Sequence, residues 1–324
     1  MNKSLIGSSC ETPNFTLLVP EQYAYLLHVL ETVLFGINIY IIHRLHKREL
    51  DAKLKQRSTL MLASSVISDF TIGVLVSPVM FFPILSAYGS GIFEKLFRLP
   101  KPFQAVVAFT NSTSMVLSMM LLAEYKHHML LPATSRLKIA TKWRVLIIAV
   151  QLPYLYGVIP YIAYFLCDDQ EGIKLENLRT KACIPPGFLE KGFVVGDVVL
   201  SLKLYLVWVM LFTVQFVYYI THSAMVVAGN KKLIISQTTL KMQKKALMIL
   251  TIQIFVPLII CLTPIVYQMI SFYLDYYNQI LNDISIKSIS FHGTVTIITT
   301  VILEPKRKSR ELERRSIVSS KTVS

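Results

Sequence analysis

Several ionisable side chains of this sequence fall inside long apolar stretches, where a charge costs about 2.5–3.5 kcal/mol on membrane-insertion scales. Glu31, Asp69, Lys203 and His292 lie near the middle of their stretches. Glu31, Asp69 and His292 come from the first, second and seventh stretches, and we expect them to form one polar cluster where these stretches are neighbours. Such a cluster either links helices by hydrogen bonds or changes its protonation and pairing between two states of the protein.

The histidines give no pattern that is typical of a metal ion or a catalytic centre. His43 and His46 are three residues apart and His127 and His128 are adjacent, but neither pair has a glutamate at zinc-protease spacing. The loops are too short to fold into a soluble catalytic domain. We therefore expect no metal, no cofactor and no enzymatic activity.

The elements that must position these residues follow from composition. The chain has 324 residues, of which 53% are hydrophobic and 16% are charged, whereas soluble domains have about 25% charged residues. A membrane-spanning helix needs about 20 mostly apolar residues. Seven runs meet this requirement: 21–42, 59–82, 103–123, 143–166, 193–220, 246–274 and 284–303. The sequence therefore predicts an all-α membrane protein with a seven-helix transmembrane domain over 21–303, preceded by residues 1–20 and followed by a basic tail at 304–324.

The basic residues predict the direction of the bundle, because cytoplasmic loops carry an excess of Lys and Arg. Of the 33 Lys and Arg residues, 23 flank one side of the predicted spans and 8 flank the other. This bias places the N-terminus outside and the C-terminus in the cytoplasm. It also argues against nucleic-acid binding, since the basic residues are scattered over four membrane-flanking segments. Asn2 and Asn14 begin glycosylation sequons on the predicted outer side.

Aromatic side chains gather in the outer halves of the fourth, fifth and sixth spans. Many belong to the interfacial aromatic belt of membrane proteins, but Tyr161, Tyr205, Trp208 and Tyr267 lie deeper. Together with Lys203 and His292 as polar groups, they are our candidates for lining a small-molecule pocket.

Prolines mark the segments that we expect to bend. Pro257 and Pro264 both lie in the sixth span, and each removes one backbone hydrogen bond from the helix. Membrane helices tolerate this when neighbouring groups satisfy the freed carbonyl. We therefore interpret the sixth span as a candidate hinge.

These features, in their order along the chain, resemble the nematode serpentine receptors of class H, a branch of the seven-helix chemoreceptors. The resemblance covers essentially the whole chain, and no single motif carries it. The matching segments are 83–88 with Gly91, 124–128, 169–171 with 183–185, Gln253 with Pro257 and Pro264, and His292-Gly293 with 305–307.

The resemblance implies a G-protein-coupled chemoreceptor in the plasma membrane, in the cilia of sensory neurons. Its partners would be the lipid bilayer, an unknown small molecule that binds from outside, and a heterotrimeric G protein at the cytoplasmic side. The residues that would face the G protein are Glu124, Lys126, Lys241, Lys244 and Lys245.

The chain also departs from the pattern of that family. Lys126 replaces the arginine expected at the inner end of the third span, which removes the bidentate guanidinium group. No cysteine stands at the outer end of the third span, so the bridge expected in many seven-helix receptors cannot form. We favour a disulfide between Cys10 and Cys183, with Cys167 and Cys183 as the alternative.

Two other functions fit parts of the sequence. Charges near the middle of the membrane often mark ion pathways, which favours a ligand-gated channel or a transporter. An odd number of spans without an internal repeat argues against that interpretation. An orphan receptor that does not couple to a G protein is a further alternative, because Lys126 departs from the family pattern.

Overall fold

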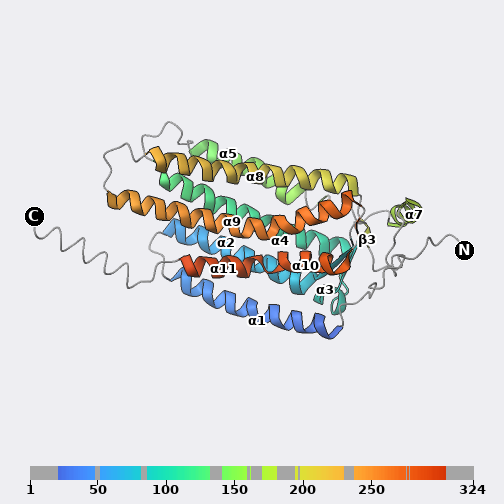
Figure 1. Ribbon diagram of the computed structural model, residues 1–324. Coiled ribbons are helices and arrows are strands. Elements are labelled where there is room, and N and C mark those ends of the chain that lie inside the picture. Colours follow the sequence, from blue (N-terminus) through green and yellow to red (C-terminus); the bar gives the residue numbers. More distant parts are fainter. Residues whose placement is uncertain are drawn as a thin grey trace, which may run out of the picture.

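The computed structural model is a bundle of long helices with a small sheet at one end (Figure 1). It describes residues 21–47, 52–81, 86–131, 141–158, 161, 170–180, 194–195, 198–229, 237–274, 276 and 278–303. The helices are α1 (Glu21–His46), α2 (Ala52–Phe70), α3 (Ile92–Lys95), α4 (Lys101–Leu130), α5 (Thr141–Pro153), α7 (Gln170–Thr180), α8 (Val198–Gly229), α9 (Gln237–Tyr273), α10 (Gln279–Ser290) and α11 (His292–Leu303). Two π-helical segments, η2 (Thr71–Val76) and η3 (Tyr154–Val158), continue α2 and α5. The strands are β1 (Pro78–Phe81), β2 (Ser86–Gly89) and β3 (Val194–Val195).

Helix α2 lies inside the bundle and contacts α1, α4 and α11. Its inward face carries Met61, Leu62 and Val66, which join residues of α4, α8 and α11 in one apolar core. Large apolar side chains on α1, α5, α8 and α9 are instead exposed. A soluble protein rarely exposes that much apolar surface, so these faces are suited to lipid.

Five of the described helices are long and apolar enough to cross a membrane, or six when the bent pair α10 and α11 is counted as one span. These correspond to six of the seven predicted spans. The fourth predicted span, 143–166, is described as α5 followed by η3 up to Val158. Helices α1, α4 and α8 extend several residues past the predicted spans at the end that we expect to be cytoplasmic.

The second span ends earlier than the predicted residue 82. Helix η2 stops at Val76, Ser77 has a left-handed backbone with φ 40°, and β1 begins at Pro78. The cause is local, because Pro78 lacks an N–H and disfavours a helical conformation in the residue before it. β1, β2 and β3 then form an antiparallel sheet in that order. The short sheet is an addition at the end of the predicted all-α bundle, which the long helices confirm.

The seventh span is broken. Helices α10 and α11 meet at Phe291 with a bend of 47°. The break leaves the first N–H groups of α11 without partners from their own helix. The side chain that accepts from two of them comes from α2.

The predicted cytoplasmic ends of α1, α4, α8, α9 and α11 gather at one end of the bundle, opposite the sheet (Figure 1). We call this end the inner end and the sheet end the outer end, following the distribution of basic residues. The predicted glycosylation sites Asn2 and Asn14 and the cysteines Cys10, Cys167 and Cys183 lie outside the described residues.

Candidate functional site

The N-terminus of α11 is held by a carboxylate from another helix. Asp69 of α2 accepts hydrogen bonds from the backbone N–H groups of Gly293 (3.1 Å) and Thr294 (3.0 Å). The Nδ1 atom of His292 lies 2.7 Å from the same carboxylate. Negative charge is favourable at this position, because unpaired N–H groups give a helix N-terminus a partial positive charge. Asp69 thus joins α2 to the break in the seventh span.

Gly293 is required for this close approach. A Cβ atom there would lie 2.7 Å from Oδ2 of Asp69 and 2.8 Å from the carbonyl oxygen of Ser65. Both distances are shorter than real Cβ atoms show, so any larger residue must push α11 away from α2. The glycine therefore belongs to the site although it has no side chain.

Glu31 of α1 extends the cluster towards the outer end. Its Oε1 atom accepts a hydrogen bond from Ser290 (3.1 Å) and lies 3.7 Å from Nζ of Lys287. Its carboxylate also rests against Gly73 of η2, where a Cβ atom would clash with it. We call Glu31, Asp69, Lys287, Ser290 and His292 the central cluster. It joins α1, α2, α10 and α11, as the sequence predicts for Glu31, Asp69 and His292.

A cavity of about 240 Å³, counted to its open mouth, lies beside the central cluster. Its polar lining includes Glu31, Asn38, Asp69, Ser290 and Thr294, while Phe35, Phe70 and Phe291 supply aromatic walls. Asn38 donates a hydrogen bond to Thr294 across this space (2.9 Å). Both polar and aromatic groups therefore border the central cluster on this side.

A second polar group lies near the inner end. Glu124 of α4 accepts hydrogen bonds from Arg57 of α2 (3.0 Å) and from Arg144 of α5. Arg57 also donates to the carbonyl oxygen of Leu121 (2.8 Å). We call Arg57, Glu124 and Arg144 the glutamate clamp. Glu124 is buried in this state, so its carboxylate does not face a partner at the inner end.

Lys126 takes part in a different set of contacts. Its ammonium group donates to Oε1 of Gln253 in α9, and Nε2 of Gln253 lies 3.4 Å from Oγ1 of Thr300 in α11. We call Lys126, Gln253 and Thr300 the inner latch. It connects three helices of the bundle, and two of its members, Gln253 and Thr300, are buried.

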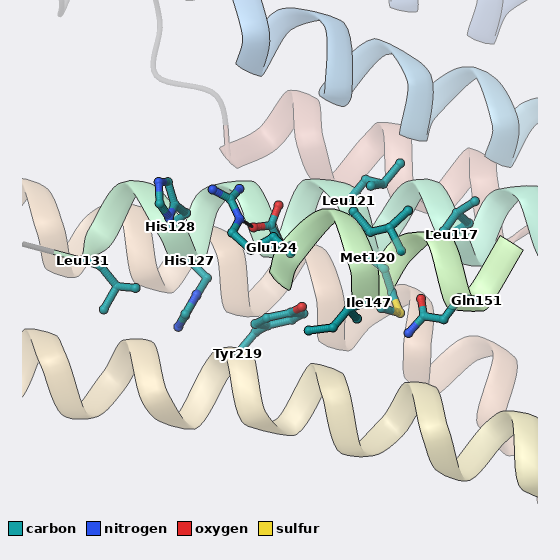
Figure 2. Close-up of a pocket in the computed structure, with 12 residues that line it drawn as sticks. Leu117, Met120, Leu121, Glu124, His127, His128, Leu131, Ile147, Gln151 and Tyr219 are labelled. Atoms are coloured by element: carbon teal, nitrogen blue, oxygen red, sulfur yellow. Dashed lines mark hydrogen bonds and ion pairs between the residues drawn. The ribbon is translucent and has the colours of Figure 1, made fainter. Parts of the chain in front are cut away.

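A narrow crevice opens between α4, α5 and α8 beside the glutamate clamp. Figure 2 shows Glu124, His127 and His128 towards one end of its α4 wall, and Leu117, Met120 and Leu121 towards the other. Nε2 of His127 lies 2.7 Å from Nδ1 of His222 in α8, and both imidazoles are buried. The crevice is therefore amphipathic along its length.

The predicted ligand-pocket residues do not share one described cavity. Tyr267 of α9 donates a hydrogen bond to Asn282 of α10 (2.8 Å), and His292 belongs to the central cluster. The side chain of Tyr161 is 62% exposed. Lys203, Tyr205 and Trp208 lie in α8, but their side chains fall outside the described part of the chain. The pocket predicted from these residues stays a prediction.

The remaining predicted residues lie at the inner end or in α9. Lys241, Lys244 and Lys245 are exposed at the start of α9. Pro257 and Pro264 are buried within α9, which is assigned as one helix across both positions. The predicted hinge therefore has no break in this state.

Sequence reasoning missed several members of the inner groups. Arg57 and Arg144 counted only towards the charge bias, and Thr300 and His222 had no spacing that distinguished them from other polar residues. Gln253 appeared only as a match to the family pattern. Their roles depend on contacts between helices, and spacing along one helix contains no information on such contacts.

The outer end has its own charged contact, between the short helix α3 and the first turn of α4. Glu94 of α3 pairs with Lys101 and accepts a hydrogen bond from Gln104 (2.9 Å). Partial burial raises the pKa of Glu94, but the hydrogen bonds from Lys101 and Gln104 outweigh this effect and hold the pKa below its usual value. Glu94 thus fastens α3 to the start of α4.

Comparison with known proteins assigns the chain to a family. No curated protein matches the chain. The family described as serpentine type 7TM GPCR chemoreceptor Srh matches residues 19–308, which include every helix described above. The match agrees with the resemblance to class H receptors seen in the sequence. The chain therefore belongs to the Srh family of seven-transmembrane G-protein-coupled chemoreceptors, and it is a multi-pass membrane protein.

Proposed function

We propose that this chain is a chemosensory receptor that binds a small molecule from the outer side and activates a heterotrimeric G protein at the inner end. The observation that carries the proposal, beside the family, is the inner latch of Lys126, Gln253 and Thr300. It ties α4 to α9 and α11 through side chains alone. Side-chain contacts can be exchanged without unfolding a helix, so this is a suitable place for a receptor to change state.

The glutamate clamp acts together with the latch in the resting state. The carboxylate of Glu124 pairs with Arg57 of α2 and with Arg144 of α5. The guanidinium groups next to the third span therefore come from these two helices and not from position 126. Lys126 donates a hydrogen bond to Gln253. The replacement of arginine by lysine at position 126 is therefore compatible with a restrained inner end, and we propose that opening the latch exposes Lys126 to the G protein.

The basic residues at the start of α9 complete the proposed contact surface. Lys241, Lys244 and Lys245 are exposed, and they follow the inner end of α8 in the chain. When α9 moves away from α4, these lysines move with it. We propose that Pro257 and Pro264 let α9 bend during this movement, since each removes one of its backbone hydrogen bonds.

We propose that the central cluster transmits ligand binding to the latch. His292 and Thr300 lie in the same short helix, α11, so a displacement of its N-terminus also moves the end that contacts Gln253. A ligand shifts the equilibrium only by binding one arrangement more tightly than the other. Tyr267 and His292, with Lys203, Tyr205, Trp208 and Tyr161, remain the proposed ligand contacts.

Asp69→Asn tests the role of the central cluster in signalling. The substitution keeps the shape of Asp69 but removes the charge that pairs with His292 and the α11 N-terminus. We expect a changed basal activity or ligand response at normal surface expression. An unchanged basal activity and an unchanged response would contradict the proposed switch at Asp69, His292 and Glu31.

The proposal also covers where the receptor resides and whether it catalyses a reaction. We propose that the receptor resides in the plasma membrane of sensory neurons, in their cilia, and that it has no enzymatic activity. Expression with a G-protein reporter and a panel of volatile and water-soluble compounds tests the function. At least one compound should raise reporter output at confirmed surface expression, and a flat response across the panel would contradict the proposal.

A channel or transporter is the second candidate, because the seventh span is broken and an acidic side chain binds the N-terminus of its second half. Transporters bind substrates at such half-helix ends. A ligand-evoked current that persists when G proteins are blocked would favour this alternative. A reporter response without such a current would favour the receptor.

A further inference from the structure

The crevice between α4, α5 and α8 is mostly polar towards the inner end and mostly apolar towards the middle of the bundle. Glu124, His127 and His128 lie towards the inner end, with Leu131 beyond them, and Leu117 and Met120 lie towards the middle of the bundle beside Gln151 (Figure 2). Arg144 lines the crevice from the first turn of α5, and Ile147 follows it one turn later. A phospholipid of the inner leaflet has the same order, with its headgroup at the inner end and its acyl chains towards the middle. The crevice is therefore oriented to accept a lipid from that leaflet.

The crevice is accessible from the bilayer. Helix α5 lies at the edge of the bundle (Figure 1), and its residue Ile147, which lines the crevice, is exposed. Such apolar exposure on a membrane helix marks the lipid-facing surface. A guest in the crevice therefore need not enter from the aqueous phase.

Arg144 offers unused hydrogen-bond donors in this crevice. Its Nε donates to Glu124, and within the described residues its terminal nitrogens have no hydrogen-bond partner, while the side chain keeps 15% of its surface exposed. A guanidinium group has five N–H donors in a planar fork, and this fork fits the oxygens of a phosphate. The side chain is already held in place by Glu124, so little further ordering is needed to bind an anion.

The local charge also favours an anionic headgroup. Glu124 carries one negative charge and is shared between Arg57 and Arg144. The glutamate clamp thus has one positive charge in excess, close to the leaflet that is rich in anionic lipids. A zwitterionic headgroup brings no net charge to balance this excess.

We propose that the crevice between α4, α5 and α8 is a binding site for an anionic phospholipid of the inner leaflet. Arg144 binds the headgroup phosphate through its terminal N–H groups, and the acyl chain packs along Leu117, Met120 and Ile147. The proposal depends on the predicted orientation of the bundle but not on the identity of the chemosensory ligand or on coupling to a G protein.

Lipid retention measures this site directly. The full chain is purified in nanodiscs that contain phosphatidylcholine alone or with one-fifth phosphatidylserine, and the lipids kept after transfer to detergent are counted by native mass spectrometry. One basic residue near the membrane surface favours an anionic lipid about fivefold. We expect the wild-type chain to retain phosphatidylserine over phosphatidylcholine by about that factor, relative to their proportions in the disc.

Three variants distinguish a defined lipid-binding site from nonspecific attraction between basic residues and anionic lipids. Arg144→Gln removes the phosphate donors, and Ile147→Trp fills the apolar part while leaving every charge in place. Both should reduce the preference to near one. Lys142→Gln is the matched control, because it removes an exposed positive charge from the same helix without lining the crevice. It should retain most of the preference. Because Ile147→Trp leaves the glutamate clamp intact, it tests the site even when Arg144→Gln lowers the yield of folded protein.

Several outcomes would overturn the proposal. Equal retention of both lipids by the wild-type chain would show that the crevice does not select an anionic lipid. An equal loss of preference in Lys142→Gln and Arg144→Gln would indicate surface charge rather than a crevice. Complete displacement of phosphatidylserine by millimolar glycerol phosphate would show that a free anion suffices, and that the acyl-chain contacts contribute nothing.

Discussion

The central cluster and the inner latch both join distant helices, but they do so with different groups. At the centre, the carboxylate of Asp69 binds backbone N–H groups at the start of α11. At the inner end, Lys126, Gln253 and Thr300 meet through side chains only. Backbone groups cannot rotate away from a partner as side chains can. The comparison therefore indicates a firm joint at the centre and a releasable contact at the inner end.

The central cluster is also more deeply buried than the inner latch. His292 and Ser290 are almost completely buried in the central cluster, and the nearest glycines leave no space for a Cβ atom. At the inner end, Lys126 is only partly buried, and Arg144 borders an open crevice. Breaking the centre should therefore reduce stability first, whereas breaking the inner end should change activity first.

Asp69→Ala should have the largest effect on stability. It leaves the N–H groups of Gly293 and Thr294 without their acceptor and removes the partner of His292. A buried hydrogen-bonding group left without its partner costs about 1–3 kcal/mol, and this substitution leaves more than one such group. We expect a strong loss of folded receptor, measured by thermal unfolding in nanodiscs. A melting temperature equal to that of the wild type would contradict the firm joint.

Gly293→Ala should have the next largest effect. The added Cβ atom meets Asp69 and the backbone of Ser65, and such overpacking costs about 1–3 kcal/mol. Gly36→Ala is the matched control, because a Cβ atom at Gly36 meets nothing within 4 Å. Thermal unfolding should rank Gly293→Ala below Gly36→Ala, and the reverse order would show that α2 and α11 are not in tight contact.

Glu94→Gln should have the smallest effect, because the ion pair of Glu94 is partly exposed and such pairs contribute about 0–1 kcal/mol. The folded-state pKa of Glu94 is depressed, so its contribution is present above the pKa of the unfolded chain and is lost as pH falls through the folded value. The wild-type chain should therefore lose the contribution of Glu94 to the free energy of unfolding below about pH 4. Glu94→Gln lacks this carboxyl group and should show no such loss. Equal loss of melting temperature on acidification in both proteins would contradict the assignment.

The sequence predicted the helices far better than it predicted their breaks. The long apolar runs are sufficient to place most spans, because the thickness of the bilayer fixes their length. The turn at Ser77 was missed, although Pro78 signals it, because the apolar run continues past the proline. The bend at Phe291 leaves no mark in composition, since its acceptor Asp69 is more than two hundred residues away in the chain.

The sequence identified those members of the candidate site that are ionisable residues inside a predicted span. Glu31, Asp69 and His292 stood out as ionisable residues among apolar neighbours, and the structure brings them to one region. Gln253 and Thr300 are uncharged, and their burial next to Lys126 depends on how α4, α9 and α11 pack. Such partners cannot be found from hydropathy, because neutral polar residues are common in membrane helices.

Basal G-protein activation of Gln253→Leu tests the inner latch most directly. The substitution removes both hydrogen bonds of Gln253, while Thr300→Val removes only the longer one of 3.4 Å. One hydrogen bond contributes about 1 kcal/mol, or about fivefold in an equilibrium, so nucleotide exchange without ligand should rise by at least about fivefold in Gln253→Leu and by less in Thr300→Val, at equal surface expression. Basal exchange in Gln253→Leu that stays at or below the wild-type level would contradict a latch that restrains the receptor.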